Sequence, residues 1–194
     1  AVEKFGHDAR YPVSNNWPHV VQQLVDFTRG VVDKTGEPAW LVGHSLGGFL
    51  SLMAASRHPE LARGVLLIDS PLLGGWRSTA VGVMKTTQMF GSLSPGAVSQ
   101  RRRNTWPTVQ AAYEHFRHKK AFAKWDDAVL MDYCQHGTLE ADGKRVLSFD
   151  RQVETQFYNT LPDNLEQLLA RHPHTCPASF IGGLASHAKK QLGM

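Results

Sequence analysis

The run Gly43-His44-Ser45-Leu46-Gly47 places one hydroxyl between two glycines, at the point where two hydrophobic patterns meet. The segment before it, 38–43, has the pattern of a buried strand, and the segment after it, 46–58, that of a helix. A G-x-S-x-G pattern in this setting is typical of a nucleophile elbow, a sharp strand-to-helix turn that holds a serine in a strained conformation with its Oγ exposed. Ser45 is therefore the candidate nucleophile.

The glycines around Ser45 have a steric interpretation. Side chains two positions before and two positions after the serine would collide across such a turn, which explains Gly43 and Gly47. Gly48 would let the following helix lie close to the sheet. The alternative interpretation is a glycine-rich strand–helix turn that carries an incidental serine.

The start of the helix after Ser45 suits a second requirement of acyl chemistry. Its free N–H groups and the positive end of its dipole favour the negative charge that develops on an attacked carbonyl oxygen. The Leu46 N–H is the natural first donor of this oxyanion hole. A serine hydroxyl also needs a base to accept its proton and a carboxylate to orient that base.

The elements that must position Ser45 are readable on both sides of it. A strand-like piece covers 1–5, and a helix is expected from near Trp17, with Asn16 as N-cap, to the stop signal at Gly36. After the elbow helix, 64–69 is a second buried strand, apolar on both faces as a parallel strand covered by helices should be. This alternation predicts an α/β fold with a parallel sheet.

Beyond Ser70 the pattern changes to helices as far as about Leu161, without a clear buried strand. A helix at 163–172, with Asp163 and Glu166 as a capping pair, and a buried strand within 176–183 then follow. The sequence predicts a core from 1–70 and 163–194 and an insertion at 71–162. Within the insertion, helices are expected at 107–116, 126–136 and 150–159, and a hairpin with an Asp-Gly turn at 138–149.

Composition excludes several classes of protein. The chain has 194 residues, is 42% hydrophobic and carries a formal net charge of +4, which is typical of an ordinary globular protein. Its two cysteines, Cys134 and Cys176, have no zinc or disulfide spacing. No apolar run reaches the roughly 20 residues of a membrane span, and the start is no signal peptide. The basic run 101–104 could meet an acidic substrate or phosphate, but it is more typical of a solvated helix end, and without interleaved aromatic residues it does not favour a nucleic-acid partner. The lone cysteines favour a reducing compartment, so we expect a cytoplasmic protein that binds neither membrane nor nucleic acid.

The chain resembles the α/β-hydrolases, in particular the group of bacterial esterases, haloperoxidases and C–C hydrolases. The resemblance rests on VEKFGHDARYP, WLVGHSLGGFLSLMAA, HPELARGVLLIDSP and CPASFIGG. It covers most of residues 1–75 and 176–183. The resemblance implies an α/β-hydrolase-type parallel sheet, with the helical insertion in the place of the family's cap domain.

The resemblance also implies where the partners of Ser45 lie. The family's usual acid position, after the strand that follows the cap, contains no carboxylate here. A second family position, at the end of the strand after the elbow helix, is occupied by Asp69, which also suits a site at the carboxyl ends of parallel strands. The alternative role for Asp69 is to cap the Ser70-Pro71 turn.

The catalytic histidine is not assigned by the sequence. The family's base follows one further strand, and the chain ends before it. His187 is the one weak candidate, whereas we expect His44 to serve in packing and His115, His118 and His136 to belong to the cap. The family's first three strands are also missing at the amino end, so the chain is expected to be a partial one with a sheet incomplete at both ends.

The expected function is hydrolysis of a small carboxylic ester or related acyl bond through an acyl-enzyme on Ser45. No metal or organic cofactor is implied, because a nucleophile and an oxyanion hole suffice. Two alternatives stay open, namely C–C hydrolysis or perhydrolysis on the same residues, and a non-catalytic binding protein or inactive fragment. The oligomeric state is not indicated.

Overall fold

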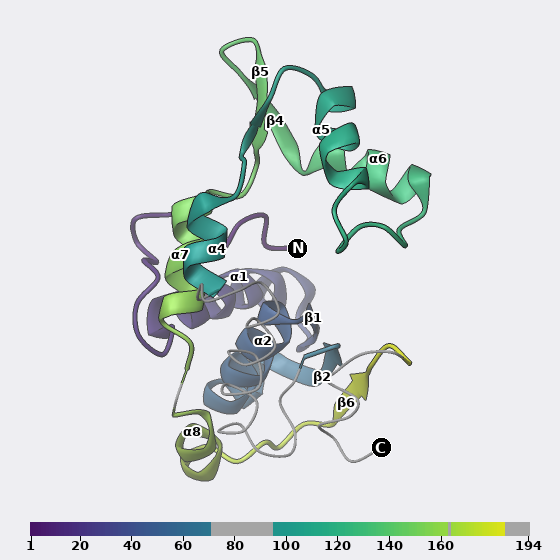
Figure 1. Ribbon diagram of the computed structural model, residues 1–194. Helices are drawn as coiled ribbons and strands as arrows, with labels where there is room; N and C mark the ends of the chain where they lie inside the picture. The colour runs from purple at the N-terminus through teal and green to yellow at the C-terminus, as the bar shows by residue number, and fades with distance from the viewer. Residues whose placement is uncertain (71–94, 163, 185–194) are drawn as a thin grey trace. The chain divides into compact units, whose positions relative to one another are not determined.

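The computed structural model describes residues 1–70, 95–162 and 164–184. These residues form two compact units, and Figure 1 labels the helices and strands of each. Of the described residues, the core unit comprises 1–70, 159–162 and 164–184, and the second unit comprises 95–158.

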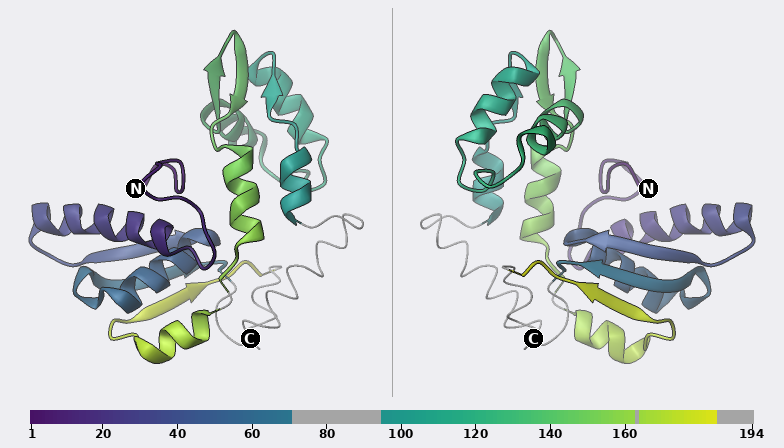
Figure 2. Two further views of the ribbon diagram at one scale, coloured as in Figure 1. Left: turned by 90° about the vertical axis from the view of Figure 1, so that its left-hand side faces the viewer. Right: turned by 90° about the vertical axis from the view of Figure 1, so that its right-hand side faces the viewer.

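A parallel three-stranded sheet organises the core unit. Its strands are β1 (Ala39–His44), β2 (Ala62–Ile68) and β6 (Ala178–Ile181), in the order β1-β2-β6. Figure 2 shows the three strands side by side, with β1 and β6 outermost. The α/β class with a parallel sheet, expected from the sequence, is confirmed.

Helices pack against this sheet on the side where its core forms. Helix α2 (Leu46–Arg57) contacts β1 and β2, and it is flanked by α1 (Pro18–Thr35) and α8 (Leu165–Arg171). Residues 48–56 of α2 are all buried, as expected for a helix that is apolar all round. The short 3₁₀ helix η1 (Pro59–Leu61) joins α2 to β2.

The two faces of β1 differ in burial. Leu41 is buried under α2, whereas the neighbouring Trp40 and Val42 are 56% and 57% exposed. Because successive side chains of a strand point to opposite faces, the core forms on the Leu41 face. Within the described residues the Trp40 face of the sheet is left open.

Helix α1 begins one residue later than the sequence suggested. The N-cap is Trp17, with φ 54°, rather than Asn16, which itself has φ 62°. The Trp17 side chain decides this, because it is 1% exposed, donates a hydrogen bond from Nε1 to Thr160 Oγ1 (3.1 Å) and packs on Phe49. The helix ends at the expected position, where Gly36 adopts φ 75° and caps the Val32 carbonyl.

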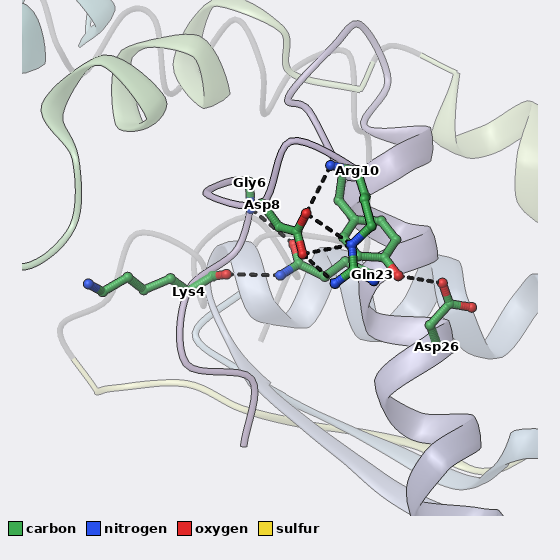
Figure 3. Close-up of polar contacts among 7 residues, drawn as sticks. Lys4, Gly6, Asp8, Arg10, Gln23 and Asp26 are labelled. Atoms are coloured by element: carbon green, nitrogen blue, oxygen red, sulfur yellow. Dashed lines mark hydrogen bonds and ion pairs between the residues drawn. The ribbon is translucent and has the colours of Figure 1, made fainter.

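Residues 1–17 contain no strand, so the expectation of a strand at 1–5 was wrong. Within the described residues no strand lies beside this segment to pair with it. Two of its backbone groups form hydrogen bonds with the side chain of Gln23 in α1 instead. The Gln23 amide donates to the Lys4 carbonyl (2.9 Å) and accepts from the Gly6 N–H (3.0 Å). Figure 3 shows this clamp. The Tyr11 hydroxyl of the same segment donates a hydrogen bond to Asp26 of α1 (2.7 Å).

The second unit combines helices with a small antiparallel sheet, and the expected helices and hairpin are present. Asp142 (φ 51°) and Gly143 (φ 67°) form the hairpin turn, with the positive angles that a two-residue turn requires. The Thr108 and Asp126 side chains cap the two central helices. The elements are α4 (Pro95–Arg101), β3 (Thr105–Trp106), α5 (Val109–Arg117), α6 (Asp127–His136), β4 (Thr138–Ala141), β5 (Lys144–Leu147) and α7 (Arg151–Asn159).

Strand β3 is an addition that the sequence analysis missed. Trp106 pairs with Arg145 of β5, is 1% exposed and packs against the ring of Phe116. A strand of two residues has no measurable hydrophobic period, so only its tertiary partners reveal it. The role of this unit as a cap stays a prediction.

Candidate functional site

Ser45 lies at the junction of β1 and α2, in the conformation expected of an elbow serine. Its backbone has φ 47° and ψ −112°, and the residue is exposed. A non-glycine residue in this region is strained by about 1–3 kcal/mol and persists only where its surroundings enforce it. One such restraint is the hydrogen bond from the Ser45 N–H to the Ile68 carbonyl at the end of β2 (3.0 Å).

Two of the three glycines are explained by close approach. A Cβ on Gly43 would lie 2.1 Å from the Gly47 carbonyl carbon and 2.4 Å from the Gly48 nitrogen. A Cβ on Gly48 would lie 2.0 Å from Ser70 Oγ. Gly43 and Gly48 therefore permit α2 to start directly against the strand ends.

The steric reason expected for Gly47 was wrong. A Cβ built on Gly47 meets no atom of the described residues within 4 Å. A Cβ at Gly43 would point into the turn, whereas one at Gly47 would point away from every atom of the described residues, so only Gly43 needs to lack a side chain for the approach of these two residues.

The Leu46 N–H stands at the first turn of α2. Among the described residues no acceptor lies within hydrogen-bonding distance of it, since the helix ladder begins with Gly48 and Phe49 donating to the Ser45 carbonyl. Leu46 itself is only half-buried. A free N–H at a helix N-terminus next to a nucleophile is the arrangement that an oxyanion hole needs.

Asp69 directly follows β2. His44 pairs with Ile68 in the sheet, so Ser45 and Asp69 are the next residues of neighbouring parallel strands, whose spacing is about 4.8 Å. The Asp69 backbone has φ 48°, and its N–H donates to the Ile181 carbonyl of β6 (2.7 Å). Its Oδ1 is buried and has no hydrogen-bond partner in the described part of the chain. A buried carboxylate oxygen without a donor is costly, and a missing partner is one explanation for it.

Ser70 is a structural residue of the site that the sequence analysis did not assign. Its buried hydroxyl donates to the Ser45 carbonyl (3.0 Å), which ties the elbow to the end of β2 a second time. The signal that was available is the small hydroxyl residue directly after the second strand, opposite Gly48.

The histidines of the core unit are placed unequally. His187, the weak candidate base, lies outside the described residues. His44 is exposed, contrary to the packing role expected for it, and precedes Ser45. His58 follows α2 and His174 precedes β6, so both lie at the amino-terminal edge of the sheet, opposite Ser45. In residues 1–70, 95–162 and 164–184, no cluster of three or more histidine, cysteine or acidic side chains suits a metal ion.

A sequence model of the alpha/beta hydrolase family matches residues 2–184. The chain belongs to the alpha/beta hydrolase family. The chloroplastic pheophytinase of Arabidopsis thaliana is 35% identical over 60 residues, which are 31% of this hydrolase and 11% of that protein.

Solved structures share the fold of this alpha/beta hydrolase at low sequence identity. The thioesterase domain from the curacin biosynthetic pathway is 20% identical, with a TM-score of 0.56 over 89% of this chain and 63% of that domain. E-2-(acetamidomethylene)succinate hydrolase is 16% identical, with a TM-score of 0.57 over 93% of this chain and 70% of that enzyme. The chain thus spans about two thirds of the length of these structures. No helix in its described residues is long and apolar enough to cross a bilayer.

Proposed function

We propose that this alpha/beta hydrolase is a serine hydrolase that cleaves a small carboxylic ester or a related acyl bond. The observation that carries the proposal is the strained, exposed Ser45 between a strand end and a helix N-terminus. A purely structural serine gains nothing from a backbone conformation that costs about 1–3 kcal/mol. The Leu46 N–H, for which the described residues offer no acceptor, and the neighbouring Asp69 carboxyl group supply two further parts of the same chemistry.

In the proposed reaction Ser45 Oγ attacks the carbonyl carbon of the substrate while a histidine accepts the hydroxyl proton. The Leu46 N–H stabilises the oxyanion, and the negative charge of Asp69 orients the histidine and stabilises its protonated form. The histidine then returns the proton to the leaving alcohol, and an activated water releases the acyl group from Ser45. No described residue is assigned the role of this base.

The reaction needs no metal or organic cofactor, because nucleophile, base and oxyanion hole together complete acyl transfer. A small-molecule substrate and a cytoplasmic location remain part of the proposal. The second unit is proposed to serve as the cap over the substrate.

The proposal is tested with a fluorophosphonate probe, which labels only an activated serine. We expect labelling of the whole protein at Ser45 and none of its S45A variant. The matched control is S179A, which removes an exposed serine of β6 and should keep full labelling. Amide exchange of the α2 backbone would verify that S45A is folded.

Substrate class is tested in the same preparations with p-nitrophenyl acetate and butyrate. Turnover that is lost in S45A and kept in S179A supports an ester hydrolase. A folded whole protein that takes up no probe would overturn the proposed serine chemistry.

A further inference from the structure

Two adjacent residues before α1 adopt left-handed backbone angles, although neither is a glycine. Asn16 has φ 62°, and Trp17 has φ 54° and ψ 35°. A bulky residue in this region is an outlier, and such a conformation persists only where the surrounding structure enforces it. Helix capping does not account for it, because Trp17 makes no side-chain capping bond to α1. The strain at Trp17 therefore points to a task of its side chain.

The Trp17 indole joins two segments that lie far apart in the chain. Its Nε1–H donates a hydrogen bond to Thr160 Oγ1 (3.1 Å), 143 residues away. Its ring packs edge-on against Phe49 of α2, with ring centroids 6.1 Å apart. Because Trp17 is already 1% exposed among the described residues, these contacts need no further segment to complete them. A single side chain thus connects Thr160 to α2, the helix that follows Ser45.

Thr160 stands where the chain returns from the second unit to the core unit. The second unit ends with residue 158 and α7 ends at Asn159, so Thr160 directly follows both. Helix α7 is itself fixed within the second unit, because Glu154 forms an ion pair with Arg102 (2.6 Å). The bond from Trp17 therefore holds the end of a helix that is anchored in the second unit.

The other contact of Trp17 lies one residue away from the candidate nucleophile. Phe49 belongs to the first turn of α2, and its N–H donates to the Ser45 carbonyl (3.3 Å). The path from Thr160 through Trp17 and Phe49 to Ser45 is therefore a continuous series of hydrogen-bonded and packed groups. Energetic coupling between separate parts of a protein is carried by such contiguous contacts.

We propose that Trp17 is a positioning residue, and that its bond to Thr160 is a latch that fixes the connection 159–162 on α2. The latch is a property of the core unit and is independent of the reaction. Its effect on catalysis rests on the proposed function, in which the second unit serves as the cap. Release of the latch lowers the fraction of molecules whose cap is in its substrate-binding position, which raises KM. The value of kcat is kept, because the backbone bond from Ser45 to Ile68 is untouched.

The first test removes the acceptor of the latch in the whole protein. Thr160→Val keeps the shape of the side chain but leaves the Trp17 indole N–H without this partner. Amide exchange in the last turn of α7, residues 157–160, should become about 2- to 10-fold faster, which corresponds to one hydrogen bond. Thr160→Ser keeps the hydroxyl and should exchange as the wild type does.

The matched control is Ser56→Ala. The buried Ser56 hydroxyl of α2 also donates to the returning chain, but it does so at the His172 carbonyl, beyond α8. The substitution removes a bond of the same kind from the same helix. It should leave the exchange of residues 157–160 unchanged.

The second test separates positioning from packing by steady-state kinetics with p-nitrophenyl butyrate. We expect Thr160→Val to raise KM about 2- to 10-fold with little change in kcat, and Thr160→Ser to keep the wild-type KM. Trp17→Phe keeps an aromatic ring beside Phe49 but lacks the N–H, so it should raise KM by a similar factor. The double variant should show no further rise, because both substitutions remove the same bond.

The outcomes distinguish the latch from the proposed reaction. Unchanged exchange in Thr160→Val, or equally fast exchange in Ser56→Ala, would overturn the latch whether or not the protein hydrolyses esters. A lower kcat at unchanged KM, or additive effects of Trp17→Phe and Thr160→Val on KM, would overturn the positioning role. A whole protein that neither takes up the probe at Ser45 nor hydrolyses the ester would overturn the proposed function and the positioning role together, and the exchange rates would still decide the latch.

Discussion

The backbone N–H of Ser45 donates a hydrogen bond to the carbonyl oxygen of Ile68, 3.0 Å away. This bond joins the residue after β1 to the last residue of β2, directly before Asp69. The candidate nucleophile and the candidate acid are therefore fixed to each other by the backbone of the sheet, not by a flexible loop. A substitution of the Asp69 side chain should therefore change activity while the backbone hydrogen bond between Ser45 and Ile68 stays in place.

Asp69→Asn tests the acid. If Asp69 orients the base, turnover of p-nitrophenyl butyrate should fall on the order of 10⁴-fold, the loss that follows when a triad aspartate becomes an amide. Stability should change little, because the Asp69 N–H keeps its bond to Ile181. The control is Asp142→Asn, an aspartate that also has a positive φ but lies in the hairpin turn. Equal turnover in both variants would remove Asp69 from the mechanism.

Gly43→Ala and Gly47→Ala should differ sharply. The first places a Cβ 2.1 Å from the backbone of Gly47, so we expect destabilisation of at least about 2 kcal/mol, as in overpacked sites, and a displaced elbow. The second meets nothing within 4 Å and replaces glycine in a helix, so it should be neutral or stabilise by up to about 1 kcal/mol. Urea unfolding measures both, and similar values for the two would contradict the geometry.

Gln23→Met should release the amino-terminal segment. The substitution keeps the length of the side chain but removes its bonds to Lys4 and Gly6, each with a net worth of about 0.5–1.5 kcal/mol. Amide exchange should accelerate at Gly6 while the centre of α1 stays protected. Gln22→Met is the control, because the Gln22 side chain donates its hydrogen bond to Asp26 on the exposed surface of α1 and not to the backbone of residues 4–6.

Acid should destabilise the second unit through His115. Burial beside Trp106 and Phe116, followed by the charges of Lys119 and Arg103, lowers the pKa of His115 below 6.5. The unfolded chain then binds the proton more readily, so the stability that neutral His115 contributes is present above pH 6.5 and is lost as the pH falls through that value toward the folded pKa.

The measurement is urea unfolding at about pH 8 and about pH 5, on either side of the ordinary histidine pKa. His115→Gln should show a smaller loss of stability between the two conditions than the wild type does. His118→Gln, at an exposed histidine of the same region, should behave as the wild type.

Local sequence was sufficient where a single residue type dictates the backbone. Gly36 ends α1 because only glycine readily takes φ 75°, and Gly43 marks the elbow because a side chain there has no space. The parallel strands were readable because they are continuously apolar. These features fix the positions of Ser45 and Asp69.

Tertiary contacts decided what sequence could not show. Trp17 sets the start of α1 through Thr160, which lies far away in the chain, and Trp106 becomes a strand only because Arg145 pairs with it. The absence of contacts at Gly47 among the described residues likewise depends on which segments surround the elbow. The identity of the catalytic base depends on tertiary contacts in the same way, because local sequence does not show which histidine the fold brings next to Ser45.

The register between β2 and β6 has a consequence for the order of folding. Val65 pairs with Ala178, and the whole second unit is inserted in the chain between them. During synthesis β2 cannot pair with β6 until the whole second unit has been made, because β6 follows that unit in the chain. The pairing of Thr138 with Leu147, in contrast, closes only a short hairpin and can form as soon as these residues have been made. We expect the second unit to be structured on the ribosome while the apolar β2 is still without β6, which makes this interval the one in which a nascent chain most needs a chaperone.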